Sequence, residues 1–167
     1  MDKEKKIIPG LRGIIPSLHT PFCNENKVDI RSLKKLIDHT VATDCSGMLV
    51  GAVAGENSSL TFKEKNRIID ECLSYNNNRI PIIISCSANN QKDRIALSKS
   101  AKEAGADWIL CQTPDNVSGN ELLQCFNEIA EVGPNNLMIQ DLSWVDNGIS
   151  DEDIMLLYNN INKFRGL

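Results

Sequence analysis

The segment Leu49–Leu60, with the sequence LVGAVAGENSSL, contains the residues of this chain best suited to bind a small ligand. A short apolar run ends at Gly51, and a turn of small residues leads to Gly55 and Glu56. A strand that passes through such a loop into a helix is typical of a βα unit. Two glycines in the loop let backbone N–H groups approach a small anion closely. The pattern therefore predicts a binding loop at the carboxyl end of a parallel strand.

Net charge, apolar stretches and cysteine spacing argue against several classes of function. The 167 residues carry a net charge of −4, and no cluster of Lys and Arg is interleaved with aromatic residues, so we expect no nucleic-acid partner. No apolar stretch approaches the roughly 20 residues that a bilayer span needs, and none resembles a signal peptide. We therefore expect a cytoplasmic protein without a membrane partner. The six cysteines form no Cys-x-x-Cys pair, which argues against a zinc site and for reduced thiols.

The elements that would position the loop alternate along the chain. Short apolar, often β-branched runs predict five strands and the start of a sixth: 13–17, 47–50, 81–85, 107–112, 136–140 and a segment from Ile161 or Phe164. Segments with helical periodicity predict five helices: one capped by Asp29, then 61–75, 91–104, 120–132 and one capped by Ser150. Thr61 and Glu64 form a capping-box pattern at the second helix.

Such regular alternation predicts parallel βαβ units, which build either an open doubly wound sheet or a closed eightfold barrel. No Gly-x-Gly-x-x-Gly follows the first strand, which argues against the dinucleotide-binding sheet. Five units in about 160 residues match the first part of a (β/α)₈ barrel of about 250 residues. We therefore expect an α/β fold, an incomplete (β/α)₈ TIM barrel. Residues 1–167 would be the N-terminal portion of one barrel domain, with 1–9 as a flexible arm.

Several short motifs follow one another in a fixed order: Thr20-Pro21-Phe22, Gly55-Glu56, Arg79-Ile80-Pro81, Gly105-Ala106-Asp107 and Thr113-Pro114. In this order the chain, from about residue 10 to 167, resembles the dihydrodipicolinate synthase and N-acetylneuraminate lyase family. The resemblance implies a class I aldolase or lyase that forms a Schiff base between a lysine and pyruvate or another 2-keto acid. It also implies a homo-oligomer, a dimer or tetramer, in the full-length form. We expect neither a metal nor another cofactor.

The family's binding loop reads Gly-Thr-Thr-Gly-Glu, where the first hydroxyl joins a proton relay and the second binds the pyruvate carboxylate. This chain has Val53 and Ala54 at those two positions, followed by the matching Gly55 and Glu56. The resemblance makes these four the substrate-binding residues, with backbone N–H groups of Ala54 and Gly55 holding a carboxylate. Gln140 stands where the family has a relay tyrosine and is the expected catalytic residue, although an amide is a poor general acid.

Two further positions depart from the family. A second relay tyrosine falls near Asp115 or Asn116, and the arginine that receives a dicarboxylic substrate aligns with Val145. These departures point away from a true dihydrodipicolinate synthase. We expect Ala54, Gly55 and Gln140 to lie within one ligand length of each other. Three cysteines are candidates for the wall of that site, with core packing as the alternative: Cys23, Cys86 and Cys111.

The Schiff-base lysine of the family ends strand six in an apolar-apolar-Gly-apolar-Lys context. Phe164 to Leu167 align with the first four of these positions, with Arg165 in place of the second apolar residue, so the nucleophile would be the next residue. The lysines on the predicted helices should lie on solvated faces. The sequence thus leaves open an aldolase that is inactive as this fragment and a non-catalytic relative that binds a small acid or a partner subunit. A third alternative is a phosphate-binding barrel enzyme of another class, whose phosphate-binding loops would follow strands seven and eight of the barrel.

Overall fold

Five parallel strands form one sheet in the computed structural model, which describes residues 11–142 and 148–167. The strands follow the chain in order, with no crossover between non-neighbours. They are β1 (Met48–Val50), β2 (Ile82–Ser85), β3 (Trp108–Gln112), β4 (Asn136–Gln140) and β5 (Phe164–Gly166). All four pairings are parallel, so every strand ends at the same edge of the sheet. We call this carboxyl-end edge the mouth.

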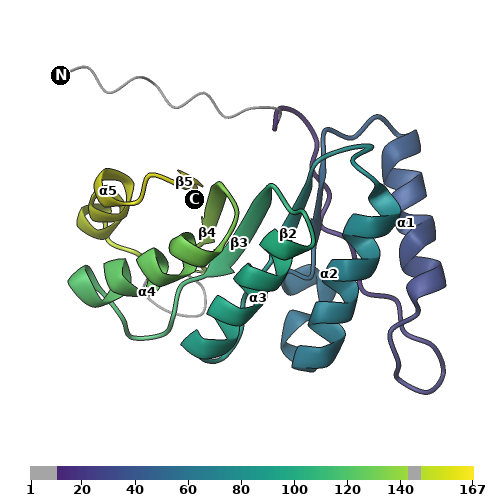
Figure 1. The fold of residues 1–167 in the computed structure, drawn as a ribbon, viewed down its shortest axis with the longest axis horizontal. Helices are drawn as coiled ribbons and strands as arrows, with labels where there is room; N and C mark the ends of the chain where they lie inside the picture. The colour runs from purple at the N-terminus through teal and green to yellow at the C-terminus, as the bar shows by residue number, and fades with distance from the viewer. Residues whose placement is uncertain (1–10, 143–147) are drawn as a thin grey trace.

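Five helices lie side by side along one face of the sheet (Figure 1). They are α1 (Ile30–Ala42), α2 (Phe62–Asn76), α3 (Gln91–Glu103), α4 (Gly119–Val132) and α5 (Asp151–Asn160). Consecutive helices are in contact with each other. A doubly wound sheet has helices on both faces, whereas a barrel has them all outside. The single helical layer and the sequential strand order therefore confirm the incomplete barrel.

The predicted first strand, residues 13–17, is not a regular strand. Within residues 11–142 and 148–167, its only ladder contact is an isolated parallel bridge from Ser17 to Leu49 of β1. Pro16 accepts a hydrogen bond from Leu49 through its carbonyl group but has no N–H to donate, and Gly13 has a positive φ of 117°. The segment therefore runs beside β1 without the alternating bonds of a full ladder. The arm predicted at 1–9 lies outside the described residues.

The main hydrophobic core lies between the sheet and the helices. Side chains that alternate along the strands, such as Ile82 and Ile84 or Leu137 and Ile139, pack there against helical residues such as Phe126. The intervening residues face the other way and form a second, smaller cluster of Ile83, Trp108 and Leu110, against which Leu11, Ile15, Leu49 and Met138 pack. This second face is the interior side of the incomplete barrel.

Helix caps fix where the helices begin. The predicted caps Asp29, Thr61 and Ser150 each accept a hydrogen bond from a backbone N–H of the first turn. At α2 the capping box is complete, because the Glu64 carboxylate also accepts from the Thr61 N–H at 2.9 Å. The hydrogen bond from the Thr61 hydroxyl, followed by that from the Thr61 N–H, lowers the pKa of Glu64.

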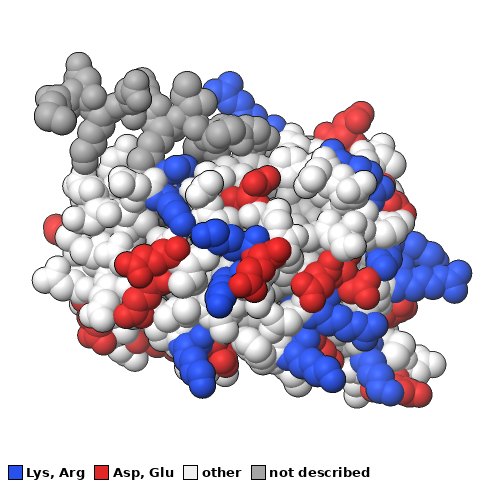
Figure 2. Space-filling model, viewed as in Figure 1, with Lys and Arg blue, Asp and Glu red and all other residues white. Residues whose placement is uncertain are grey.

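The outer face of the helical layer is polar. Acidic and basic side chains are interspersed over it in Figure 2. In the described part of the chain, no helix is both long and apolar enough to cross a membrane.

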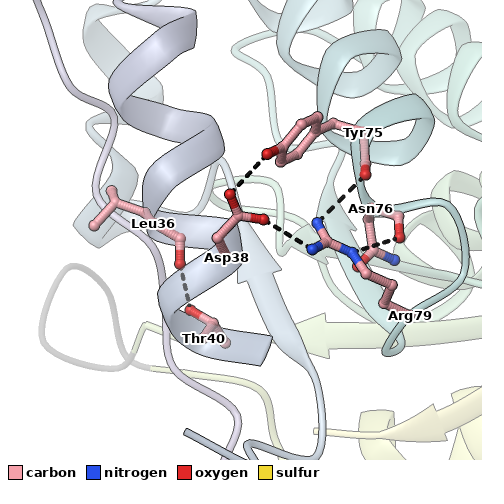
Figure 3. Close-up of polar contacts among 6 residues, drawn as sticks. All are labelled: Leu36, Asp38, Thr40, Tyr75, Asn76 and Arg79. Atoms are coloured by element: carbon pink, nitrogen blue, oxygen red, sulfur yellow. Dashed lines mark hydrogen bonds and ion pairs between the residues drawn. The ribbon is translucent and has the colours of Figure 1, made fainter. Parts of the chain in front are cut away.

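A polar cluster joins α1 to the end of α2 (Figure 3). The Asp38 carboxylate accepts hydrogen bonds from the Tyr75 hydroxyl at 2.7 Å and from the Arg79 guanidinium at 2.8 Å. The Arg79 guanidinium and the Lys34 amine each lie 5.2 Å from the centre of the Tyr75 ring. The hydrogen bond from Tyr75, followed by that from Arg79, lowers the pKa of Asp38. A charged Asp38 therefore stabilises the contact between the two helices.

Replacing Asp38 by Asn should lower the urea midpoint of unfolding at neutral pH. Because the folded-state pKa of Asp38 lies below its ordinary value of 3.8, the carboxylate contributes stability above that value. The contribution is lost as the pH falls through the lowered pKa. In urea denaturation measured from pH 7 to pH 3, the midpoint of the parent should therefore exceed that of Asp38→Asn at neutral pH. The two midpoints should converge in acid. The exposed Asp70→Asn of α2 is the control, and an equal effect of both variants would contradict this account.

Candidate active site at the carboxyl ends of the strands

The loop after β1 consists of two short 3₁₀ turns, Val53–Gly55 and Asn57–Ser59. Glu56 joins them in the left-handed conformation, with φ 56°, and its side chain is exposed. The Gly55 N–H donates to the Ala52 carbonyl at 2.9 Å. That N–H is therefore engaged within the turn, contrary to the expectation that it holds a carboxylate. Only the N–H groups of Val53 and Ala54 precede the first bond of the turn.

Gly55 is required by a close approach of two backbone segments. A Cβ atom at this position would lie 3.1 Å from the Leu18 carbonyl oxygen and 3.4 Å from the Thr20 hydroxyl. The Thr20 hydroxyl donates to the Gly55 carbonyl at 2.6 Å, and His19 Nδ1 lies 2.9 Å from the Ala54 carbonyl oxygen. Residues 18–20, which follow the β-bridge between Ser17 and Leu49, thus hold the binding loop in place. Packing explains this glycine without a ligand.

Gln140 ends β4 on the interior side of the barrel, the same side as Met138 two residues before it. The register pairs it with Gln112, the last residue of β3. The Gln112 side-chain amide donates to the Gln140 side-chain oxygen at 3.2 Å. Gln140 therefore points away from the helical layer and stands at the mouth. Its neighbour Gln112 was not among the residues expected at the site.

Gln112 and Gln140 form a polar wall at the mouth, and two serines extend this wall toward β2. The Ser85 hydroxyl donates to the Ser87 hydroxyl at 3.1 Å, and the Ser87 hydroxyl oxygen accepts from the Gln112 N–H at 3.0 Å. Both serines are buried. The bonds connect the ends of β2, β3 and β4 through neutral groups. The wall can donate and accept hydrogen bonds, but none of its side chains is a strong acid or base near neutral pH.

Lys65 corrects the expectation that the helical lysines all lie on solvated faces. It is only partly exposed, and its amine donates to the Asn57 side-chain oxygen at 2.8 Å and to the Ser87 carbonyl at 3.0 Å. Burial lowers the pKa of this amine, and the charge of Asp93 opposes the shift. Asn57 in turn donates to the Gly51 carbonyl at 2.6 Å. Lys65 thus connects the loop after β1 to the loop after β2. The helical periodicity of apolar residues in the sequence could not indicate this connection.

The loops that follow β1, β2, β3 and β4 lie together at the mouth where they are described. A groove of about 670 Å³ is lined by residues that follow four successive strands, among them Val53, Ala88, Thr113 and Leu142. Val145 lies outside the described residues, as does most of the loop after β4. The expected proximity of Ala54, Gly55 and Gln140 stays a prediction.

Two of the three cysteines expected in the wall of the site lie in the core instead, and the placement of Cys23 in that wall stays a prediction. Cys86 and Cys111 are completely buried in the main core between sheet and helices, so packing explains them. Cys23 is exposed in the loop before α1. No cluster of three or more His, Cys, Asp or Glu side chains suited to a metal ion occurs within 11–142 and 148–167.

Comparison with known proteins gives one consistent answer. Residues 10–162 match the model of the dihydrodipicolinate synthetase family. The chain belongs to this family. A 4-hydroxy-tetrahydrodipicolinate synthase of Persephonella marina is 38% identical over 122 residues, which are 72% of this chain and 41% of that protein. The chain thus spans less than half the length of this curated relative, and 34% of a second one, from Salinibacter ruber.

Solved structures agree on the fold. The dihydrodipicolinate synthase of Aquifex aeolicus superposes with a TM-score of 0.82 at 25% identity, over 90% of this chain and 52% of that one. CdNal from Clostridium difficile, solved in complex with mannosamine, gives 0.86 at 26% identity, over 93% of this chain and 55% of that one. These family members therefore share the arrangement of strands and loops described above.

Substituting Gly55 by Ala tests the packing of the binding loop. The added methyl group must push the Leu18 backbone away, which should cost about 1–3 kcal/mol of unfolding free energy, less a few tenths from a stiffer unfolded chain. Urea denaturation measures the loss. Ser58→Ala, at an exposed position of the same loop, should leave the midpoint nearly unchanged. A Gly55→Ala variant as stable as the parent would contradict the close approach.

Proposed function

We propose that this chain is the N-terminal portion, residues 1–167, of a single-domain class I aldolase or lyase that acts on pyruvate or another 2-keto acid. The observation that carries the proposal is the barrel-facing Gln140 at the mouth, next to Gln112 and on the same edge as the loop 53–57. Ligands of (β/α)₈ enzymes bind at this edge. The family membership supports the Schiff-base route, with the lysine after Leu167.

The binding residues of the proposal are Val53, Ala54, Gly55 and Glu56. The carboxylate of a 2-keto acid would meet the N–H groups of Val53 and Ala54, because the Gly55 N–H is already engaged. Backbone N–H groups at fixed positions stabilise negative charge without side-chain hydroxyls. Gly55 then contributes by letting the loop approach Leu18, rather than by direct contact.

Gln140 is the proposed catalytic contact. Its amide can donate a hydrogen bond to a substrate oxygen and thereby orient it, but it has no proton to exchange near neutral pH. Proton transfer would pass through water or a substrate oxygen. Because no hydroxyl side chain stands at position 53 or 54, we propose a substrate other than that of a true dihydrodipicolinate synthase. No metal or other cofactor is required by this chemistry.

The full-length protein would be a cytoplasmic homo-oligomer, a dimer or tetramer, without a nucleic-acid or membrane partner. One observation favours a second candidate, a non-catalytic family member that binds a small acid or a partner subunit. Val53 is 48% exposed in the loop where a proton relay would begin, and its side chain cannot carry a proton.

Borohydride trapping distinguishes the two functions. The Schiff-base route needs a neutral amine, which a desolvated position favours. The present chain, incubated with pyruvate and borohydride, should gain no mass, because the Lys65 amine is held by Asn57 and Ser87 and the Lys163 amine by two carbonyls at the C-terminal end of α4. A chain extended through the eighth strand should gain one reduced pyruvate if the residue after Leu167 is a lysine.

Replacing that lysine by Ala in the extended chain is the matched control and should abolish the adduct. Peptide mapping identifies the labelled residue. An adduct on the present chain would overturn the assignment of the amine. An extended chain that folds but remains unlabelled would establish the non-catalytic candidate instead.

A further inference from the structure

Lys65 is bonded to both halves of the proposed site, and the mechanism above gives it no role. It lies near the beginning of α2, and its half-buried amine donates to the Asn57 side-chain oxygen at 2.8 Å and to the Ser87 carbonyl at 3.0 Å. Asn57 belongs to the loop whose N–H groups would hold the substrate carboxylate. Ser87 belongs to the polar wall that includes Gln140. One amine therefore connects the carboxylate-binding loop with the wall.

The Asn57 side chain transmits this connection into the loop. Asn57 is buried, and its side-chain nitrogen donates to the Gly51 carbonyl at 2.6 Å. Since Gly51 precedes the residues Val53 and Ala54 and Asn57 follows them, this bond spans the base of the loop. The bond from Lys65 to the Asn57 oxygen fixes the amide with its nitrogen toward Gly51. Without the amine, the oxygen of this buried side chain would lose that partner, and the amide could turn away from the loop.

Lys65 itself lies behind the loop. Among the described residues, the lining of the 670 Å³ groove includes Val53 and Asn57 but not Lys65. The cavity that Lys65 does line has a volume of about 10 Å³, which is barely enough for one water molecule and too small for a substrate. An effect of Lys65 on the substrate must therefore pass through the groups that its amine holds.

We infer that Lys65 is a positioning residue for the substrate carboxylate and that it acts through Asn57. The groups that it positions are the N–H groups of Val53 and Ala54, so the inference rests on the proposed function, which assigns the carboxylate to them. The second bond, to Ser87, fixes the loop relative to the polar wall. A substrate then meets a loop that is already ordered, and binding energy is not spent on ordering it.

Lys65→Met, made in the chain extended through the eighth strand, removes the amine and keeps an unbranched apolar side chain. Lys63→Met is the matched control, at an exposed position of the same helix. The rate of labelling is measured against pyruvate concentration, with cyanoborohydride to reduce the Schiff base. Lys65→Met should raise the half-saturating concentration of pyruvate about tenfold, the loss expected for a charged hydrogen bond, and leave the maximal rate within about twofold. Lys63→Met should change neither value.

Hydroxyacetone separates carboxylate positioning from a general loss of structure. It has the ketone of pyruvate but a hydroxymethyl group in place of the carboxylate. Labelling by hydroxyacetone should therefore be equally fast in Lys65→Met and in the parent. Asn57→Ala is the second variant if Lys65→Met does not fold, and it should impair pyruvate selectively in the same way. The double variant should lose no more than either single variant, because the two residues act in series.

Amide hydrogen exchange tests the positioning of the loop on the present chain, without a Schiff base. The N–H groups of Gly55 and Glu56 donate within the turn, to the carbonyls of Ala52 and Val53. Both should exchange faster in Lys65→Met than in the parent, because the turn opens more often once Asn57 is released. Lys63→Met should leave their exchange unchanged.

Three results would overturn the inference while leaving the proposed function intact. They are unchanged exchange in Lys65→Met, an unchanged half-saturating concentration of pyruvate, and an equal loss of labelling with pyruvate and with hydroxyacetone. An extended parent chain that pyruvate does not label would overturn the proposed function, and the carboxylate role of Lys65 with it.

Discussion

The parallel register of the strands is the constraint on which the site depends. Because all pairs are parallel, every strand ends at one edge, and because side chains alternate along a strand, every second residue faces the barrel interior. The five register pairs between β3 and β4 bring Gln112 and Gln140 together. A slip of β4 by one residue would move the Gln140 amide into the helical layer and away from Gln112. The hydrophobic core therefore positions the polar wall.

Contacts between neutral groups secure the loops at that edge, together with the half-buried amine of Lys65. Gly55 permits the close contact with the segment around Leu18, and the Thr20 hydroxyl stabilises this contact by donating a hydrogen bond to the Gly55 carbonyl. Lys65 connects the loops after β1 and β2 at the cost of its own desolvation. The chemistry available there is hydrogen bonding and orientation. In the proposed Schiff-base route, the amine nucleophile would come from another part of the protein.

Local signals predicted most of the fold. The capping residues Asp29, Thr61 and Ser150 and the apolar runs of the strands were recognisable because these patterns are set by neighbours in sequence. The first strand was predicted wrongly, since apolar content did not reveal how Pro16 interrupts the ladder. In the site, alternation from the end of β4 and the family resemblance together located Gln140.

Other members of the site depend on contacts between distant segments. Lys65 has the sequence context of an ordinary helical surface residue, and only its contacts with the loops after β1 and β2 draw its amine partly out of solvent. The engaged N–H of Gly55 depends on the exact turn, and that turn is fixed partly by residues 18–20. A periodicity of apolar residues contains no information on these contacts.

A crystal structure of the extended chain, reduced with borohydride in the presence of pyruvate, would test the account most directly. The account predicts that the adduct lies on the interior side of the barrel. There its carboxylate should accept from the N–H groups of Val53 and Ala54, and the Gln140 amide should lie within about 3 Å of an adduct oxygen. An adduct whose carboxylate is held by other groups, with Gln140 out of hydrogen-bond reach, would contradict it.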